Sequence, residues 1–167
     1  MRTIFLIGFM GCGKTTVGRL LAEELGLGFI DTDLEIENKA QKSISRIFLE
    51  EGEKRFRELE TSLINEIAGK EMVVATGGGA ILKEMNRQTM KKTGMVIFLE
   101  ASEEEIAKRL ANDETRPLLA GDKQKEIKER LAARLPLYHA ASHTQIPVDG
   151  KAPETIVKEI AGWLKQA

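Results

Sequence analysis

The sequence predicts an α/β protein in which a parallel sheet is covered by helices on both faces. The first observation is that short apolar runs alternate with helix-like segments along all 167 residues. The second is a glycine-rich turn that joins the first apolar run directly to the first helical segment. The third is that neither a linker nor an internal repeat interrupts the alternation. Because a chain of this length can bury one core, we expect residues 1–167 to form a single domain.

The expected strands are apolar runs too short to be complete helices. They cover 3–7, 28–30, 72–76, 95–99 and, more weakly, 144–148. The expected helices carry apolar residues three or four positions apart and cover 16–25, 34–40, 43–52, 53–69, 84–92, a segment after Ser102, 123–138 and 153–163. Gly26 is typical of a helix end, and either Ser43 or Ser45 can cap a helix start. Pro153 suits the first position of the last helix.

The composition indicates an ordinary globular protein. The net charge is -1, which argues against general binding of nucleic acids. A single cysteine cannot form an internal disulfide, and no apolar run approaches the length of a membrane span. The first strand begins almost at Met1, so we expect no targeting segment and a cytoplasmic location. No long apolar stripe remains after the core is assigned, which favours a monomer.

Residues 8–15 fit the phosphate-binding pattern G-x-x-x-x-G-K-[ST], and they lie between a strand and a helix as that pattern requires. The glycines permit turns that direct backbone N–H groups at one spot, where the helix dipole also favours an anion. Lys14 can then reach the β- and γ-phosphates of a nucleotide, and the Thr15 hydroxyl can coordinate Mg²⁺. The predicted phosphate contacts are Gly11, Cys12, Gly13, Lys14, Thr15 and Thr16. The alternative is a glycine-rich turn with a surface lysine.

Cys12 lies inside this loop and is expected to contribute only its backbone. A thiol at a helix N-terminus can have a lowered pKa. We therefore hypothesise that oxidation or alkylation of Cys12 blocks nucleotide binding.

Right-handed crossovers bring the carboxyl ends of the strands to one edge, where open α/β sheets bind ligands. Asp31 and Asp33 follow the second strand at this edge. We expect Asp31 to contact Mg²⁺ through water and Asp33 to face the substrate that accepts the phosphate. Both carboxylates could instead cap a helix. Gly77, Gly78 and Gly79 end the third strand and resemble a site of close approach or anion binding, the alternative being a tight turn.

Three arginines are candidates for anion binding. Arg57 and Glu60 are three residues apart, so they can pair and present a guanidinium to a carboxylate, although spacing alone favours an exposed ion pair. Arg116 lies in the segment 112–122, which lacks helical periodicity and could close over a site, or it is a surface arginine. Arg134, considered alone, reads as a cation at a helix C-terminus.

Together these segments resemble the shikimate kinase family over nearly the whole chain. The resemblance rests on the order and spacing of 8–19, 31–33, 56–60, 77–80, 116–119, and Arg134 four residues before Tyr138. Cys12 is the main departure, because the family more often has Ser or Ala there.

The resemblance implies a P-loop NTPase fold like that of the nucleoside monophosphate kinases. That fold has three layers, with five parallel strands in the order 2-3-1-4-5, a shikimate-binding region at 31–60 and a mobile lid at 112–122. The implied reaction transfers the γ-phosphate of ATP to the 3-hydroxyl of shikimate, on the pathway to chorismate and aromatic amino acids. ATP and shikimate are the implied partners, with one Mg²⁺ held at Thr15 and Asp31.

The resemblance also implies residue roles. Asp33 contacts the shikimate hydroxyls and can accept a proton, while Arg57 and Arg134 bind its carboxylate. The backbone of Gly78, between Gly77 and Gly79, lies nearby. Lys14, Asp33 and Arg116 form the implied catalytic set, with Arg116 reaching the phosphates from the lid. The implied adenine site consists of Arg109, Lys151 and Pro153.

Two alternatives remain at this point. One is another small-molecule P-loop kinase, such as a gluconate kinase or a nucleoside monophosphate kinase. The other is a nucleotide-binding regulatory module without catalysis, against which the intact set of Lys14, Thr15, Asp31, Asp33 and Arg116 argues.

Overall fold

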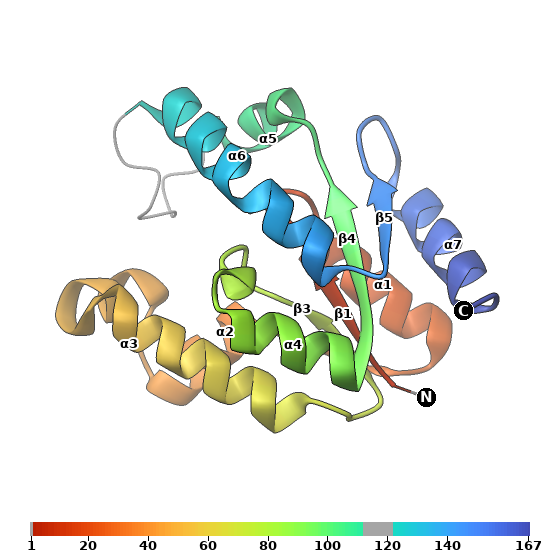
Figure 1. Ribbon diagram of the computed structural model, residues 1–167, viewed down its shortest axis with the longest axis horizontal. Coiled ribbons are helices and arrows are strands. Elements are labelled where there is room, and N and C mark those ends of the chain that lie inside the picture. Colours follow the sequence, from red (N-terminus) through yellow and green to blue (C-terminus); the bar gives the residue numbers. More distant parts are fainter. Residues whose placement is uncertain (1, 112–121) are drawn as a thin grey trace.

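The fold is a parallel sheet between two layers of helices (Figure 1). A computed structural model describes residues 2–111 and 122–167. Within these residues, five parallel strands pair in the order β2-β3-β1-β4-β5. They are β1 (Thr3–Ile7), β2 (Gly28–Asp31), β3 (Met72–Ala75), β4 (Gly94–Glu100) and β5 (Thr144–Pro147). The predicted fold class and strand order are confirmed.

The burial of each strand follows its place in the sheet. All five residues of β1 are buried, because the strand has neighbours on both sides: Leu6 is in register with Ala75 of β3 and with Ile97 of β4. Strands covered on both faces are continuously apolar, as β1 is. In the edge strand β5 only Ile146 is buried, which explains why its sequence signal is weak.

Helices cover both faces of the sheet (Figure 1). One layer consists of α1 (Lys14–Leu25) and α7 (Pro153–Leu164), and the other of α3 (Ile44–Ile67), α4 (Glu84–Thr93) and α6 (Lys123–Ala141). Between β2 and α3 lies α2 (Thr32–Ala40), which packs on α3, and α5 (Glu103–Leu110) packs on α6. A short 3-10 turn at Ala80–Leu82, absent from the sequence prediction, follows the glycine triplet.

Most predicted helix ends are confirmed. Gly26 ends α1 with a left-handed φ of 66°, and Pro153 is the first residue of α7. The Ser43 hydroxyl, rather than that of Ser45, caps α3 by accepting a hydrogen bond from the Arg46 N–H at 3.2 Å. The Ser102 hydroxyl caps α5 in the same way.

The predicted division at Gly52 is confirmed: α3 consists of two helical stretches joined across a kink at Gly52, whose φ of 85° lies outside the helical region. One helix prediction is corrected. The helix expected at 123–138 continues to Ala141 despite Pro136. Of the predicted lid, residues 112–121 lie outside the described residues, and Asp122 caps α6. None of the helices in the described part of the chain is long and apolar enough to cross a membrane.

Candidate active site

A cavity of about 820 Å³ lies at the carboxyl edge of the sheet, toward which the arrowheads of β4 and β5 point in Figure 1. It brings together residues from the loop after β1, the start of α2, the kinked part of α3, the glycine triplet after β3 and α6. The predicted residues among its walls are Gly11, Gly13, Lys14, Thr15, Thr16, Asp31, Asp33, Arg57, Gly77, Gly78, Gly79 and Arg134. Most of the predicted site is therefore assembled in one place.

The phosphate loop surrounds its own lysine. Lys14 is the first residue of α1, and its Nζ donates hydrogen bonds to the carbonyl oxygens of Gly8 and Phe9 at 2.7 and 3.0 Å. Gly13, directly before the helix, has a φ of 96°, which favours glycine over residues with a side chain. The surface-lysine alternative is wrong, because Lys14 is only 8% exposed and lies inside the loop.

Cys12 is part of the core under this loop. Its side chain is 1% exposed, and its Sγ lies 3.6 Å from Lys14 Nζ. A reagent can therefore reach the thiol only if the loop opens, so the hypothesis of inhibition by thiol modification requires that opening first.

Thr15 and Asp31 form a pair of oxygen donors beside the loop. The Thr15 hydroxyl donates to Asp31 Oδ2 at 2.5 Å, while Asp31 Oδ1 accepts from the N–H groups of Asp33 and Leu34 at 3.0 and 3.2 Å. The capping interpretation of Asp31 is thus confirmed, and its second oxygen remains directed at Thr15. Hydroxyl and carboxylate oxygens suit Mg²⁺. The described residues contain no cluster of three metal-ligating side chains, so an ion here would depend on phosphate and water for its other ligands.

Arg57 and Glu60 form a buried ion pair. Arg57 Nη1 lies 3.0 Å from Glu60 Oε1, Arg57 is 9% exposed and Glu60 is fully buried. The expectation of an exposed pair is wrong, because this face of α3 is turned toward the cavity and the glycine triplet. Within the described residues, Arg57 Nε and Glu60 Oε2 are buried and have no hydrogen-bond partner. The guanidinium therefore retains donor capacity for a ligand.

The surroundings of Glu60 favour the neutral, protonated form of its carboxyl group. Burial raises the pKa of its carboxyl from 4.5 to about 7, and the nearby charge of Asp33 raises it as well. The charge and hydrogen bond of Arg57 and the charge of Arg134 lower this pKa, but burial outweighs them. The end of the cavity lined by Asp33, Arg57, Glu60 and Arg134 thus combines two cations with two carboxylates in a poorly solvated space.

The glycine triplet lies against these charged groups. A Cβ on Gly79 would lie 2.5 Å from Arg57 Nη1 and Nη2, and one on Gly77 would lie 2.7 Å from Asp33 Oδ1 and Glu60 Oε2. A side chain at either position would occupy the space of the charged groups, so both glycines allow a close approach of these groups to the backbone. The Ala80 N–H also donates to the Gly77 carbonyl at 3.1 Å, as in a turn, and the predicted contact with a ligand stays a prediction. The Gly77 N–H donates to the Thr32 hydroxyl at 3.0 Å, which ties the triplet to the start of α2.

Arg134 faces the same end of the cavity from α6. It is 4% exposed, and its guanidinium carbon lies 5.6 Å from the ring centroid of Phe9. The interpretation as a C-terminal cation is wrong, because α6 continues for two further turns and buries this face. Burial lowers the pKa of Arg134, yet a guanidinium stays charged in proteins. Its Nη1 is buried without a hydrogen-bond partner among the described residues.

Sequence reasoning gave no role to several residues that shape this end. Tyr138 donates from its hydroxyl to the Gly78 carbonyl at 2.6 Å, and Thr32 is fully buried under Gly77. Phe48 lines the cavity and contacts Phe56, with ring centroids 5.2 Å apart. The helical spacing between Arg134 and Tyr138 is a signal that could have placed both on one face.

The predicted adenine residues lie apart from the walls of this cavity. Arg109 Nη1 donates to the Gly11 carbonyl at 3.2 Å, so Arg109 lies against the phosphate loop from α5. Lys151 pairs with Glu159 at 2.9 Å, and Pro153 begins α7. Arg116 lies outside the described residues. Their roles stay predictions.

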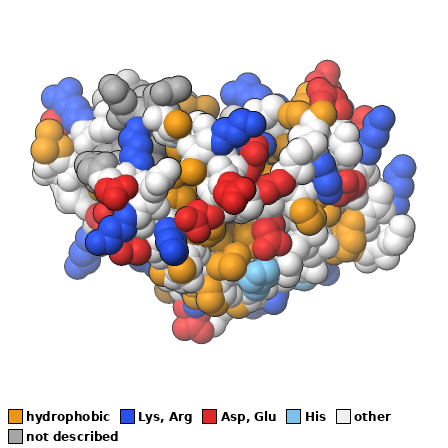
Figure 2. Space-filling model, turned by 90° about the horizontal axis from the view of Figure 1, so that it is seen from above, with side chains coloured by type: hydrophobic (Ala, Val, Ile, Leu, Met, Phe, Trp, Pro, Cys, Tyr) orange, Lys and Arg blue, Asp and Glu red, His pale blue; other side chains and the backbone are white. Residues whose placement is uncertain are grey.

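The surface around these elements carries charges of both signs. On the face seen in Figure 2, Lys and Arg side chains are interspersed with Asp and Glu side chains.

The sheet order 2-3-1-4-5 and the phosphate loop at its carboxyl edge define a P-loop kinase. The two buried arginines beside the loop, Arg57 and Arg134, indicate that it acts on a small molecule. The family model of shikimate kinase matches residues 10–165. A shikimate kinase of Persephonella marina is 46% identical over 99% of this chain and its own full length. The chain belongs to the shikimate kinase family.

Solved structures agree with this assignment. The structure of shikimate kinase from Acinetobacter baumannii in complex with shikimate superposes with a TM-score of 0.96 at 39% identity, covering 99% of this chain and 94% of that one. A gluconokinase from Sinorhizobium meliloti reaches a TM-score of 0.64 at 20% identity, covering 99% of this chain and 93% of its own. That second likeness concerns the fold alone.

Proposed function

We propose that this chain transfers the γ-phosphate of ATP to the 3-hydroxyl of shikimate, as the reaction of its family requires. The observation that carries the proposal is a single cavity holding both the phosphate loop and the buried Arg57 and Arg134. The relative from Acinetobacter baumannii is described in complex with shikimate. Shikimate is an anion with three hydroxyls, so its site needs arginine and carboxylate groups together.

Arg57 and Arg134 bind the carboxylate of the acceptor in this proposal. Both guanidinium groups are buried, and each has a nitrogen without a protein partner among the described residues. A buried donor without a partner costs free energy, which a ligand oxygen would recover. The Gly78 N–H lies in the same wall and is assigned to the acceptor as well.

Asp33 orients the acceptor hydroxyl and can take its proton as the new bond to phosphorus forms. Phosphoryl transfer has a loose transition state, so positioning and charge neutralisation contribute more than base catalysis. Lys14, and Arg116 from the segment 112–122, supply the neutralising charge. Arg109, Lys151 and Pro153 are assigned to the adenine end.

We assign Mg²⁺ to the oxygen pair of Thr15 and Asp31, with Asp31 acting through water. The 2.5 Å contact between the two side chains and their hard oxygen donors fit this ion. When bound, Mg²⁺ neutralises phosphate charge.

A coupled assay of ADP release tests the proposal directly. Shikimate, gluconate and nucleoside monophosphates are each supplied with MgATP, and the product with shikimate is examined by ³¹P NMR. We expect rapid ADP release with shikimate and none with the other two acceptors. The ³¹P NMR spectrum should show the phosphate on the 3-hydroxyl of shikimate. Turnover of gluconate or a monophosphate instead would assign a different acceptor. Nucleotide binding without turnover of any acceptor would indicate a regulatory module.

We further propose that the enzyme is a cytoplasmic monomer without nucleic-acid or membrane partners. The mixed charges in Figure 2 support the absence of nucleic acid. Light scattering at increasing protein concentration tests the monomer, for which a mass near 18.5 kDa is expected.

A further inference from the structure

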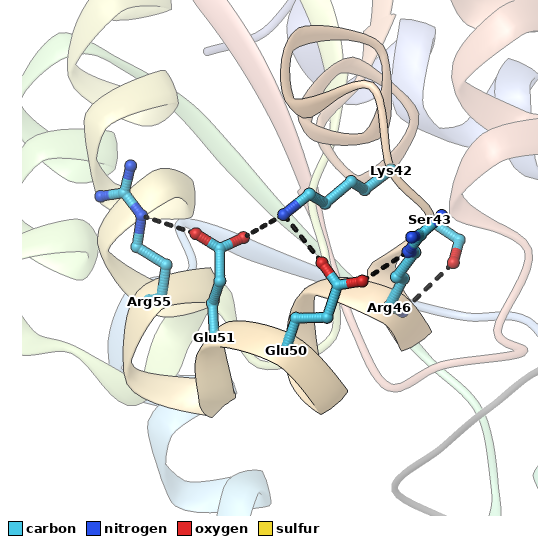
Figure 3. Close-up of polar contacts among 6 residues, drawn as sticks. All are labelled: Lys42, Ser43, Arg46, Glu50, Glu51 and Arg55. Carbon is cyan, nitrogen blue, oxygen red and sulfur yellow. Dashed lines mark hydrogen bonds and ion pairs between the residues drawn. The ribbon is translucent and has the colours of Figure 1, made fainter.

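Five charged side chains outside the cavity form a continuous network around the start of α3 (Figure 3). Lys42, in the link between α2 and α3, lies at its centre: its Nζ is 2.9 Å from Glu50 Oε2 and 3.2 Å from Glu51 Oε2. Glu50 also pairs with Arg46 at 2.6 Å, and Glu51 with Arg55 at 3.9 Å. In Figure 3 both glutamates turn toward the single lysine between them.

The network joins segments that the helix itself does not hold rigidly. Gly52 has φ 85° and ψ 166°, so the helical geometry of α3 is interrupted between Glu51 and Glu53. A Cβ on Gly52 would meet no heavy atom within 4 Å, so neighbouring side chains do not brace the kink there. Lys42 and Arg46 lie before the kink and Arg55 after it, and Glu51 contacts both sides.

The part of α3 before the kink forms a wall of the acceptor end. Ile44, Ser45 and Phe48 line the cavity, whereas the five network residues do not. Phe48 contacts Phe56 across the kink on the inner side, with ring centroids 5.2 Å apart. The wall is thus tied across the kink by an aromatic contact inside and by the Glu51–Arg55 pair at 3.9 Å outside, while Lys42 holds Glu50 and Glu51 to the link between α2 and α3.

We propose that Lys42, with Glu50 and Glu51, positions this wall over the acceptor, so that the network sets the affinity for shikimate without contacting it. Glu50 and Glu51 are adjacent in the sequence and carry like charges, and Lys42 compensates both. The contacts with these glutamates raise the pKa of Lys42, and those with Arg46 and Lys42 lower the pKa of Glu50. Lys42 and Glu50 are therefore charged near neutral pH. The inference rests on the proposed acceptor site.

The central test compares Lys42→Gln with Lys39→Gln. Lys39 forms a similar exposed pair, with Glu66 at 2.5 Å, but that pair links α2 to the part of α3 after the kink. Lys42→Gln should raise the KM for shikimate about three- to fivefold, with kcat and the KM for ATP within about twofold, because exposed ion pairs are individually weak. Lys39→Gln should leave kcat and both KM values unchanged. Lys42→Arg, which keeps the positive charge, should retain the wild-type KM for shikimate.

Amide hydrogen exchange without substrate gives a readout independent of the reaction. In Lys42→Gln and in Glu51→Gln, exchange should accelerate in residues 44–51 and stay unchanged in β1. Wild-type turnover of shikimate tests the proposed function by itself, and the exchange experiment tests the network even if another acceptor is used.

Three results would overturn the proposal. The first is an unchanged shikimate KM in Lys42→Gln, and the second is an equal increase in Lys39→Gln. The third is acceleration of exchange over the whole sheet, which would mean that the lysine stabilises the fold rather than the wall.

Discussion

The two ends of the cavity that we propose for the donor and for the acceptor are built in different ways. The donor end is a consecutive loop after β1, in which Lys14 is surrounded by backbone carbonyls of its own segment. The acceptor end takes Asp33, Arg57, Gly79 and Arg134 from four separate parts of the chain. A local motif can form a site from backbone geometry, whereas the dispersed end depends on the packing of α3 and α6 and on mutual compensation of buried charges.

The largest effect is expected at the donor end, from Lys14→Met. The variant removes a cation from the phosphates in the transition state, so kcat should fall about 10²- to 10³-fold. The KM for shikimate should change little, because Lys14 belongs to the other end of the cavity. Steady-state kinetics with each substrate varied in turn measures both constants. Lys158→Met, at an exposed position of α7, is the matched control. A kcat within tenfold of the wild type would contradict the role of Lys14.

A smaller effect is expected from Arg57→Ala, and it should appear in the KM for shikimate rather than in kcat. The KM for shikimate should rise about 10- to 100-fold, since charge-assisted hydrogen bonds of about 1.5–3 kcal/mol are lost before and during transfer. The values of kcat and the KM for ATP should change much less. Arg19→Ala, at an exposed position of α1, serves as the control. An unchanged KM would contradict the carboxylate assignment.

Arg57→Ala also leaves Glu60 buried without its cation. The double variant Arg57→Ala/Glu60→Gln no longer buries a carboxylate without a cation, so the loss of stability from that carboxylate is avoided. If the shikimate KM of the double variant returned to the wild-type value, the effect of Arg57 would come from the fold rather than from the acceptor.

The same contrast explains how far the sequence predicts the structure. The loop at 8–15 is predictable because pattern, strand and helix are contiguous, and the alternation of elements predicts the layered sheet. The burial of Arg57 and Glu60 is not predictable from their spacing, which does not say which face of α3 is covered. Arg134, considered alone, reads as a terminal cation because it lies near the end of the helix expected at 123–138, yet α6 continues to Ala141. Only the resemblance to a family brought these arginines together before the structure did.

The third prediction concerns the pH dependence of the free energy of unfolding, to which Glu60 at the acceptor end contributes. The pKa of Glu60 is raised from 4.5 to about 7 in the folded state, so the folded protein keeps a proton that the unfolded chain releases above pH 4.5. This contribution to stability is therefore lost progressively as the pH rises from 4.5 to 7, and the loss is complete above 7. Between pH 5 and 8, the free energy of unfolding of the wild type should fall by about 2 kcal/mol relative to Glu60→Gln.

Urea unfolding at several pH values measures this difference. The comparison with a variant is needed because His143 titrates with the opposite sign: burial lowers its pKa, so stability is lost as the pH falls. Glu53→Gln, which also removes a partner of Arg57 but from a half-exposed position, is the control. Parallel stability curves for wild type and Glu60→Gln would show that burial does not hold the proton.

Of the effects inside the cavity, the smallest is expected from Gly79→Ala, which adds one methyl group to the acceptor end. Gly79 has φ -97° and ψ 6°, a conformation open to alanine, so the backbone should not be strained. The new Cβ would lie 2.5 Å from both terminal nitrogens of Arg57 and must displace the guanidinium from Glu60. We expect the KM for shikimate to rise about tenfold, less than in Arg57→Ala because the charge remains nearby.

Gly162→Ala is the matched control, because a Cβ there would meet no heavy atom within 4 Å. It should leave the kinetic constants unchanged and can only stabilise α7. A tenfold rise in the shikimate KM of Gly79→Ala, with an unchanged KM for ATP, would mean that the acceptor end fails through one displaced side chain. An equal rise in both constants would instead mean that the two ends share one rigid wall, and the contrast between a local donor site and a dispersed acceptor site would no longer hold.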